Sequence, residues 1–531
     1  MQQSPKAREV LMLAAENAAL KGGKVGGMAD VIRDLPAALA KQGVTAHIIM
    51  PDYGFLAREQ QAEFMCEFPV HFDSGHFLIK MFRLPNPLQP LAWIYLLAHQ
   101  QFISPGHGIY TQDAAGRPFA TDAGKFALFC TAVATALCGG LLPLPERLHL
   151  HDWHCGFFTM LRHYMQEYAT LKQIPVILTI HNLAMQGIRP LHGDISSLEA
   201  WFPELSKKTP HQLANIIDPR YPECVNPLRA AINLSDSVHL VSPGYAEEVL
   251  QPSQHEQGFF GGEGLEYDLQ QVQRRGKLYG ILNGCEYPPL REDSPSRDEL
   301  KRQLVSLANE ALLYKLGFSE NVHPSELIAQ IRLFQQGRPK AFLLTSVGRL
   351  TDQKMLLLRQ PWQGKIVLDG ILARLKAWNP KARFWLLGSG DDAIARQFSE
   401  VAARHDNFLF VNGYHEELSD ALYACGDLFL MPSSFEPCGI SQMLALRGAQ
   451  PCLVHSIGGL RDTVVDGKNG FSFSGDNLQE QANELLNTLD RALALYGSEP
   501  WLVMVKNAVS CRFDWQTSAK RYVTELYGMV E

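Results

Sequence analysis

The sequence VGGMADVI at residues 25–32 returns in altered form as IGGLRDTV at residues 457–464. Both stretches read as a branched residue, two glycines, a large aliphatic residue, any residue, Asp, any residue and a branched residue. Adjacent glycines let the backbone turn sharply and let a ligand approach its N–H groups. If a helix begins at each pair, its first amides and the positive end of its dipole form an anion site. A single turn of this kind is uninformative. Two matching turns near the ends of a long chain predict twin nucleotide-type domains that face each other across a cleft.

The composition is that of a globular protein without a strong charge bias. The chain has 531 residues, of which 46% are hydrophobic and 19% charged, which is typical of two to four well-packed domains. The formal net charge of −7 argues against nucleic acid or a membrane as a partner. The 10 cysteines are scattered without a C-x-x-C pair. That pattern predicts a reduced, cytoplasmic chain rather than a disulfide framework.

Two apolar stretches bear on export and membrane insertion. Val10–Ala15 is apolar, but Glu16 and Asn17 interrupt it before any cleavage-site pattern appears, so no export signal is predicted. Residues 126–145 carry no charge and are long enough to span a bilayer. Because two glycines and two prolines interrupt this stretch, a buried helix over Asp122–Leu137 is the simpler prediction.

Short apolar runs alternate with helical stretches along the chain. Runs that are apolar on both faces indicate parallel sheets covered by helices on each side. The first series of predicted strands comprises Val10–Ala14, Thr45–Met50, Ala92–Leu97, Leu148–Leu150, Val176–Ile180, Ser237–Val241 and Leu278–Ile281. The second series comprises Phe342–Val347, Arg383–Leu387, Phe408–Val411, Leu428–Met431 and Pro451–Val454.

These series predict an α/β protein with two Rossmann-like, doubly wound parallel-sheet domains. The expected organisation is an N-terminal domain over residues 1–287, a linker segment leading into the second domain over 288–340, and a C-terminal domain over 341–505. The linker segment carries a predicted helix near Asp298–Leu316. Residues 506–531 are expected to form a C-terminal helix that packs back on the body. One face of that helix would carry Trp515, Ala519, Tyr522, Val523 and Leu526,.

Polar motifs follow the predicted strands where those strands end, which is where ligands bind in open parallel sheets. The motifs are HDWH (151–154), HN (181–182), GRLTDQK (348–354), GSGD (388–391) and PSSFEPCG (432–439). Arg349 could bind a diphosphate as a planar fork and Lys354 as a point charge. Two solvated charges are the alternative, but their position at a strand end favours binding.

Glu436 and the histidines of residues 149–154 each leave alternatives open. The Glu436 carboxylate can accept sugar hydroxyls or stabilise positive charge at an anomeric carbon, or it can complement a helix dipole. His149, His151, Asp152 and His154 invite a zinc hypothesis. An Asp and a His at the edge of a cleft satisfy sugar hydroxyls equally well, and we expect no metal.

Together these segments resemble bacterial glycogen synthases and plant starch synthases, the retaining ADP-glucose-dependent glucosyltransferases of GT-B architecture. The resemblance runs from Leu11 to about Tyr527 and makes the N-terminal domain the acceptor side and the C-terminal domain the nucleotide-sugar side. The segments that carry it are KVGGMAD (24–30), HDWH (151–154), TIHNLA (179–184), GILNG (280–284), GRLTDQK (348–354), FEPCG (435–439) and GGL (458–460).

The resemblance assigns phosphate-binding roles in both domains. Lys24, Gly26 and Gly27 would lie against the phosphates of the donor. Arg349 and Lys354 would hold the diphosphate as it leaves.

The resemblance also assigns residues to the sugar and the base. Asp152 and His181 would contact the transferring glucose, with Asp30 and Asn283 nearby. Glu436 would cradle the sugar from the C-terminal domain. The remaining donor-binding positions are Cys438, Gly439, Gly458, Gly459 and Tyr414, the last as the aromatic residue that stacks on adenine. The family needs no metal, and no cofactor is expected.

Several positions depart from the family pattern. Met28 replaces Leu, Met185 replaces an aromatic residue, and Ser434 stands where the family usually has Arg. The segment 355–372 is rewritten. The phosphate-binding and catalytic positions therefore survive, while the residues around them do not.

The resemblance predicts a glycogen or starch synthase that transfers glucose from ADP-glucose to the non-reducing end of an α-1,4-glucan with retention. Its substrates would be ADP-glucose and glycogen or a maltooligosaccharide. The alternatives are a related glycosyltransferase using another nucleotide sugar or acceptor, a catalytically inactive glucan-binding protein, and a metal-dependent hydrolase built on residues 149–154. Inactivity would show as substitution of His181, Glu436, Arg349 or Lys354, and none is substituted.

Overall fold

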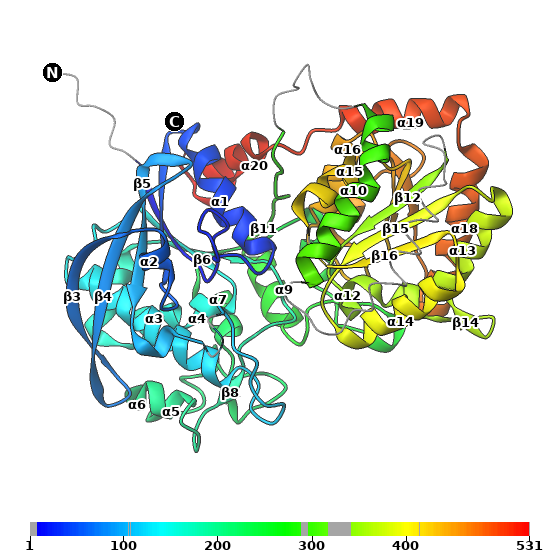
Figure 1. Ribbon diagram of the computed structural model, residues 1–531. Coiled ribbons are helices and arrows are strands. Elements are labelled where there is room, and N and C mark those ends of the chain that lie inside the picture. Colours follow the sequence, from blue (N-terminus) through cyan, green and yellow to red (C-terminus); the bar gives the residue numbers. More distant parts are fainter. Residues whose placement is uncertain are drawn as a thin grey trace. The chain divides into compact units, whose positions relative to one another are not determined.

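The computed structural model describes residues 8–104, 106, 108–287, 296–316, 341–413 and 415–529. The chain folds into two compact α/β units (Figure 1). The N-terminal unit comprises Met1–Ser253, Gly261–Gly284 and Trp515–Glu531. The C-terminal unit comprises Gln254–Phe260 and Cys285–Asp514. The domain boundaries drawn from the sequence stay predictions.

The N-terminal unit is built on a 9-stranded sheet in the order β11-β10-β7-β6-β1-β2-β5-β4-β3. The strands from β11 through β5 run parallel, whereas β4 pairs antiparallel with both of its neighbours, β5 and β3. The chain builds outward from β1 in one direction and then returns to β6 on its other side, so the doubly wound switch point lies between β1 and β6. The strands are β1 (Arg8–Leu13), β2 (Val44–Pro51), β3 (Glu63–Phe72), β4 (Gly75–Asn86), β5 (Gln89–Ala98), β6 (Arg147–His151), β7 (Val176–Ile180), β10 (Ser237–Leu240) and β11 (Leu278–Gly280).

Every strand predicted for this half of the chain is present, with ends shifted by a few residues. The antiparallel hairpin β3–β4 was not predicted. Its strands alternate between buried and exposed residues, because they form the edge of the sheet. They therefore lack the continuous apolar run that marks a central parallel strand. A separate two-stranded pair is formed by β8 (Arg189–Pro190) and β9 (Cys224–Val225).

Helices cover the parallel strands of this unit. α4 packs against both α3 and α7, and α1 packs against α20. α3 is buried along most of its length, which confirms the buried helix predicted over this uncharged stretch. Within the described ranges, no helix combines the length and the apolar character needed to cross a membrane. The helices and short helical turns are α1 (Gly27–Ala40), α2 (Leu56–Glu59), η1 (Gln100–Phe102), α3 (Ala120–Cys138), η3 (Trp153–Cys155), α4 (Gly156–Tyr164), η4 (Gln166–Gln173), α5 (Leu198–Trp201), α6 (Pro203–Ser206), α7 (Pro227–Leu234), α8 (Pro243–Glu248), η5 (His255–Gln257, assigned to the C-terminal unit) and α9 (Glu266–Arg274).

The last described residues return to the N-terminal sheet. They form α20 (Trp515–Arg521) and the π-helical turn η7 (Tyr522–Leu526). All the residues predicted to share one face of this segment are buried. Tyr527 lies just beyond η7, and its hydroxyl meets Nδ1 of His149 on β6 at 2.8 Å. Arg147, on the same strand, donates to the Tyr527 carbonyl at 3.0 Å.

The C-terminal unit has a 6-stranded, wholly parallel sheet in the order β16-β15-β12-β17-β18-β19. This is the doubly wound order with its switch point between β12 and β17. All the strands predicted here are present, and β19 is an addition. The strands are β12 (Leu343–Val347), β15 (Arg383–Gly388), β16 (Phe408–Asn412), β17 (Leu428–Met431), β18 (Cys452–His455) and β19 (Gly470–Phe473), with a small hairpin of β13 (Pro361–Trp362) and β14 (Lys365–Ile366).

Helices cover both faces of this sheet (Figure 1). One core packs α13, α14 and α18 on the strands, and the other face carries α10, α15 and α16. α10 is anchored by Lys301, whose ammonium meets a carboxylate oxygen of Asp427 at 2.8 Å. The helices are α10 (Arg297–Leu316), α12 (Asp352–Met355), η6 (Leu357–Arg359), α13 (Val367–Trp378), α14 (Asp392–Arg404), α15 (Glu416–Cys425), α16 (Ser441–Arg447), α17 (Gly458–Thr463), α18 (Leu478–Leu495) and α19 (Glu499–Ser510).

The contact between Tyr527 and His149 generates a stability prediction. Both side chains are fully buried, so Tyr527→Phe leaves a ring nitrogen of His149 without its partner. We expect the free energy of unfolding to fall by about 1–3 kcal/mol, the usual cost of a buried polar group left unpaired. Urea unfolding followed by tryptophan fluorescence measures it. Tyr221→Phe is the matched control, because Tyr221 is exposed; equal stability of the two variants would contradict the prediction.

Candidate functional site

In the N-terminal unit, polar side chains gather where β1, β6 and β7 end. Glu16 follows β1, Asp152 follows β6 and His181 follows β7. β1 pairs with β6, and β6 pairs with β7, so these three positions share one edge of the sheet. Glu16 and Asp152 flank the switch point itself, which is where open α/β sheets bind ligands.

Asp152 has an unusual backbone conformation, and its side chain is hydrogen-bonded to the His181 backbone. Its φ is 57°, a left-handed value that few non-glycine residues adopt, and its side chain is buried. Oδ1 accepts hydrogen bonds from the backbone N–H of His181 at 2.6 Å and of Asn182 at 3.4 Å. Burial raises the pKa of the Asp152 carboxyl to about 7, although those two amides favour its ionised form,.

His181 extends from the end of β7 as a half-buried imidazole. Its Nε2 lies 3.0 Å from Nδ1 of His151 on β6, and the two rings are stacked at 5.3 Å between centroids. Burial lowers the pKa of His181 to about 3. The ring is therefore neutral near pH 7 and can either donate or accept at its remaining nitrogen, Nδ1.

The loop that follows His181 is pinned by Gln186. The amide of Gln186 donates to the carbonyls of Leu183 and Glu263, both at 3.1 Å. Its oxygen accepts from Arg220 at 2.8 Å and from Asn226 at 2.7 Å. Its amide therefore has partners for both N–H groups and for its oxygen, and the loop that carries His181 is fixed at its far end.

Glycine is required at the next position of this loop. Gly187 has φ +68°, and a Cβ there would meet the Trp153 ring at 2.1 Å. Trp153 belongs to the HDWH motif, so Gly187 lets the loop after β7 lie directly against the motif after β6.

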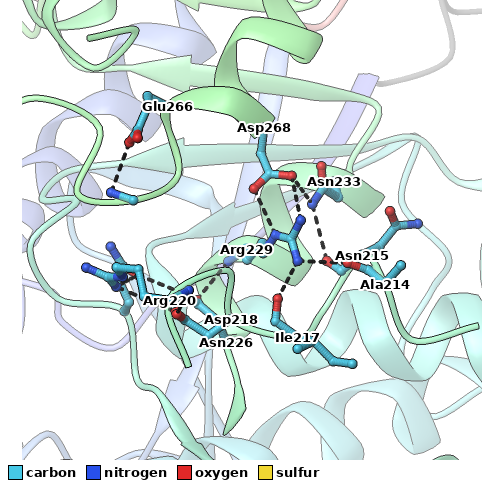
Figure 2. Close-up of polar contacts among 12 residues, drawn as sticks. Ala214, Asn215, Ile217, Asp218, Arg220, Asn226, Arg229, Asn233, Glu266 and Asp268 are labelled. Atoms are coloured by element: carbon cyan, nitrogen blue, oxygen red, sulfur yellow. Dashed lines mark hydrogen bonds and ion pairs between the residues drawn. The ribbon is translucent and has the colours of Figure 1, made fainter. Parts of the chain in front are cut away.

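Behind this loop, a network of buried and half-buried polar groups ties α7 to α9 (Figure 2). The Arg229 guanidinium makes two hydrogen bonds to the Asp268 carboxylate, at 2.8 and 3.1 Å, and donates to the carbonyls of Ala214 and Ile217. Asn226 caps α7 by accepting from the Arg229 backbone at 2.9 Å. Because Asn226 also donates to Gln186, this network is continuous with the loop after His181.

The first glycine loop already holds an anion from its own chain. One carboxylate oxygen of Glu16 accepts from the backbone N–H of Val25 at 2.8 Å and of Gly26 at 2.5 Å. α1 begins at Gly27, so a helix does start at this pair as expected. Lys24, the candidate phosphate ligand beside it, forms an ion pair with Asp30 at 2.8 Å. The amides of Val25 and Gly26 thus hold a carboxylate of the chain itself, and the phosphate-binding role of this loop stays a prediction.

Sequence reasoning missed Glu16 and the residues that support it. Glu16 follows a predicted strand, so the strand-end rule that selected Asp152 would have found it. Its other oxygen accepts from the Tyr110 hydroxyl at 2.7 Å, and the Tyr110 ring stacks on His154 at 5.4 Å. The loop before Tyr110 is held by the buried Lys125, which donates to the Ile109 carbonyl at 2.7 Å and to the Asp122 carboxylate at 2.8 Å. No sequence signal marks Tyr110.

Asn283, the remaining candidate of this unit, follows β11 and is buried. Its backbone N–H donates to the Val241 carbonyl at 3.2 Å. Its side-chain oxygen has no hydrogen-bond partner in the described part of the chain.

In the C-terminal unit, the loops after β12 and β17 meet at the switch point through Lys354 and Glu436. The Lys354 ammonium forms an ion pair with Oε2 of Glu436, and the Ser433 hydroxyl donates to the same oxygen at 3.1 Å. Gln353 closes the two loops further by donating to the Phe435 carbonyl at 2.9 Å and accepting from the Ser434 backbone at 2.9 Å. Ser433 and Gln353 lie within the motifs named from the sequence, but neither was a candidate site residue.

The second glycine pair serves close packing as well as starting a helix. α17 begins at Gly458, and the Gly459 backbone donates to the Glu436 carbonyl at 3.1 Å. A Cβ at Gly459 would meet the Cys438 carbonyl oxygen at 2.1 Å. Gly439 has φ +76°, so both glycines are needed to bring the two backbones together next to Glu436.

The remaining candidates of this unit differ in how firmly they are held. Arg349 is exposed. The residue after it is fixed, because the backbone of Leu350 pairs with Ser389 at 2.8 Å and with Asp391 at 2.9 Å. Tyr414, the expected adenine-stacking residue, lies outside the described residues.

The geometry gives the zinc hypothesis no ligand set. Both ring nitrogens of His149 are engaged, one with Tyr527 at 2.8 Å and the other with Thr179 at 2.6 Å. Among the residues that the structure describes, no group of three or more His, Cys, Asp or Glu side chains is placed to hold a metal ion.

Two family models match the chain. Residues 9–271 match the starch synthase catalytic domain, and residues 343–491 match glycosyl transferases group 1. The glycogen synthase of Paracoccus denitrificans is 32% identical over 529 residues, which cover 97% of each chain. The glycogen synthase of Geotalea daltonii is 31% identical over 527 residues, which cover 96% of each chain.

Solved structures agree with these matches. The catalytic domain of starch synthase IV from Arabidopsis thaliana, bound to ADP and acarbose, superposes with a TM-score of 0.75 at 26% identity, covering 98% of this chain and 99% of that one. Sucrose-phosphate synthase from Thermosynechococcus elongatus shares the fold, with a TM-score of 0.51 at 16% identity over 98% of each chain. The predicted fold class, two Rossmann-like parallel-sheet domains of GT-B type, is confirmed.

The raised pKa of Asp152 predicts a pH-dependent stability. Between its usual pKa of 3.8 and the folded value of about 7, the folded protein keeps a proton that the unfolded chain has lost. Stability contributed by this site therefore falls as the pH rises through that window. We expect Asp152→Asn to be more stable than the parent at pH 8, with the difference shrinking towards pH 4.5.

Urea unfolding of both proteins at pH 8, 6 and 4.5 measures this difference. Asp298→Asn, on the exposed side of α10, is the control and should show no such trend. A stability difference for Asp152→Asn that is the same at all three pH values would show that the carboxyl is not held protonated by burial.

Proposed function

This chain belongs to the glycogen synthase and starch synthase family of glycosyltransferases, and from that premise we propose that it transfers glucose from ADP-glucose to the non-reducing end of an α-1,4-glucan with retention. One observation carries the proposal. In each unit, the candidate residues gather at that unit's own switch point, with Asp152 near His181 in one and Lys354 on Glu436 in the other.

In the C-terminal unit, the proposed task is to hold the diphosphate as it leaves. Arg349 is exposed and carries a planar fork suited to phosphate,. Lys354 is paired with Glu436 in the structure. A diphosphate would take over the Lys354 ammonium, which frees the Glu436 carboxylate to accept sugar hydroxyls. Negative charge that develops on the leaving group is then met by cations already in place.

In the N-terminal unit, the proposed task is to bind the transferring glucose. Asp152 and the neutral His181 offer hydrogen-bonding groups, with Asn283 as a third. The glycine loop and Lys24 would meet the donor phosphates at the start of α1, where the amides of the first turn point outward. Because Glu16 already occupies the amides of Val25 and Gly26, its role is to hold the loop in shape from behind.

The chemistry proposed here needs no metal or other cofactor, because lysine, arginine and backbone amides supply the positive charge. We also propose a cytoplasmic location. All 10 cysteines lie within the described residues and none forms a disulfide there, which suits a reducing compartment.

A donor panel tests the proposed function. Purified protein is incubated with glycogen or maltoheptaose and with ADP-, UDP- or GDP-glucose, and release of the nucleoside diphosphate is followed. We expect ADP-glucose to be the preferred donor and each product to be lengthened by α-1,4 linkages, as read by NMR of the product. Preference for another nucleotide would overturn the donor assignment. Failure of every donor would support the inactive glucan-binding alternative.

Removal of either cation should slow transfer without unfolding the protein. We expect Lys354→Ala and Arg349→Ala each to lower turnover at saturating donor by about 10²-fold, as the loss of one charge-stabilising group does. Steady-state kinetics and the thermal midpoint are measured on the same preparations. Lys381→Ala, at an exposed position of the same unit, is the control. Turnover near that of the parent in either variant would remove the diphosphate role.

A further inference from the structure

Behind His181 lies a buried layer of histidines on adjacent strands. His149 and His151 are on β6, Thr179 is on β7 and His239 is on β10, and all four side chains are buried. Burial lowers the pKa of His149 and His151 well below the usual value and that of His239 to about 4. The rings are therefore neutral near pH 7, and each carries a single ring proton whose position its neighbours decide.

One backbone carbonyl, that of Ile281, fixes which groups donate and which accept in most of the hydrogen bonds of this layer. Nε2 of His239 lies 3.1 Å from the Ile281 carbonyl, which can only accept, so His239 carries its proton on Nε2. Nδ1 of His239 is then an acceptor that faces two hydroxyls, that of Thr179 at 2.9 Å and that of Tyr522 at 3.3 Å. We assign the donor to Thr179, which is the nearer of the two. The Thr179 oxygen is left to accept from Nε2 of His149 at 2.6 Å. Nδ1 of His149 in turn accepts from the Tyr527 hydroxyl.

His151 and His181 do not belong to this series of hydrogen bonds. The rings of His149 and His151 lie 4.3 Å apart between centroids but share no hydrogen bond among the described contacts. The pair is joined only through Nδ1 of His151 and Nε2 of His181, 3.0 Å apart. One of these two nitrogens donates and the other accepts. Which of them carries the proton depends on whether Nε2 of His151 is protonated.

The surroundings of Nε2 of His151 decide where the proton between His151 and His181 lies. Nε2 of His151 is buried and has no hydrogen-bond partner in the part of the chain that the structure describes. A proton on Nε2 would be an orphaned buried donor, which is rarer in proteins than an under-used acceptor. With the proton on Nδ1 instead, His151 donates to His181 and leaves only a lone pair unpaired. His181 then accepts at Nε2 and carries its own proton on Nδ1.

We propose that His151 is a positioning residue that holds His181 in its Nδ1–H form, so that His181 presents a neutral hydrogen-bond donor to a hydroxyl oxygen of the transferred sugar. The sugar as ligand rests on the proposed function, whereas the position of the protons does not. His181 would otherwise be free to exchange between two forms, of which only one offers a donor at Nδ1. Fixing that form in advance removes the need to select it when the sugar binds.

The proton positions can be read directly in the unliganded protein. Protein labelled with 15N in histidine alone is studied by two-dimensional 1H–15N correlation of the ring nitrogens at pH 7.5. His151→Asn and His181→Ala provide the assignments of the two rings. We expect His181 to show a protonated Nδ1 and an unprotonated Nε2, and His151 to show the same pattern. A protonated Nε2 on His181 would overturn the proposal, whatever the turnover of the enzyme.

A pair of isosteric variants tests the effect on catalysis. Asn carries its amide nitrogen at the same number of bonds from the backbone as Nδ1 of His, whereas Leu has the same shape as Asn and no donor. We expect His151→Asn to keep kcat within about 3-fold of the parent and His151→Leu to lower it about 10-fold or more, the value of one hydrogen bond. KM for the donor should change little in either variant, because the diphosphate is held elsewhere.

Equal kcat in the two variants would overturn the positioning role, since both lose the imidazole equally. If His151→Leu fails to fold, the ring-proton reading of the parent still decides the proposal. A parent protein that transfers no glucose from any donor but shows the expected ring protons would refute the proposed function and leave the position of the protons established.

Discussion

Burial of polar groups at the carboxyl ends of parallel strands is the constraint on which the rest of this structure depends. A parallel sheet covered on both faces leaves its strand ends as the only place where polar side chains meet a ligand. Here those ends are themselves largely closed from water, and Asp152 and Glu436 are each 6% exposed. Each buried group must therefore find a partner within the protein. Asp152 finds the amides after β7, and Glu436 finds Lys354 and Ser433.

The same demand explains why candidate binding groups in each unit already have a partner from the chain itself. Glu16 places a carboxylate on the amides of the first glycine loop, and Glu436 neutralises the cation that is proposed to bind the diphosphate. The two carboxylates differ in how they could respond to a ligand. Glu16 is also held by Tyr110 and belongs to the framework. Under the proposed function, Glu436 would give up its ion pair with Lys354 and keep its hydrogen bond to Ser433.

The sequence was sufficient for the parallel core and for the residues at its strand ends. Continuous apolar runs such as Val176–Ile180 identify central strands by themselves, and the doubly wound rule then places His181 and Asp152 at a common edge. The edge hairpin β3–β4 was not predicted because its half-exposed strands lack such a run. Tyr110 and Gln353 were not identified as site residues for another reason. Tyr110 lies outside the motifs, and Gln353 lies inside GRLTDQK (348–354) without having been a candidate. Each acts by contacting another loop, and which loop it meets depends on packing that periodicity does not encode. The two matching glycine pairs also differ in their packing. A Cβ at Gly459 would meet the Cys438 carbonyl oxygen, whereas a Cβ at the corresponding Gly27 would meet nothing within 4 Å.

The return of the last residues to β6 has a consequence for the order in which the chain can fold during synthesis. The strands of the N-terminal sheet are made before residues 285–514, yet the Tyr527 hydroxyl that completes His149 is made after them. Until then the histidine layer behind the proposed site lacks its final donor, and the face that receives α20 is open. The C-terminal unit is contained in Gln254–Phe260 and Cys285–Asp514, so all of its residues are made before Trp515. Vectorial synthesis therefore favours completion of the second unit before the first.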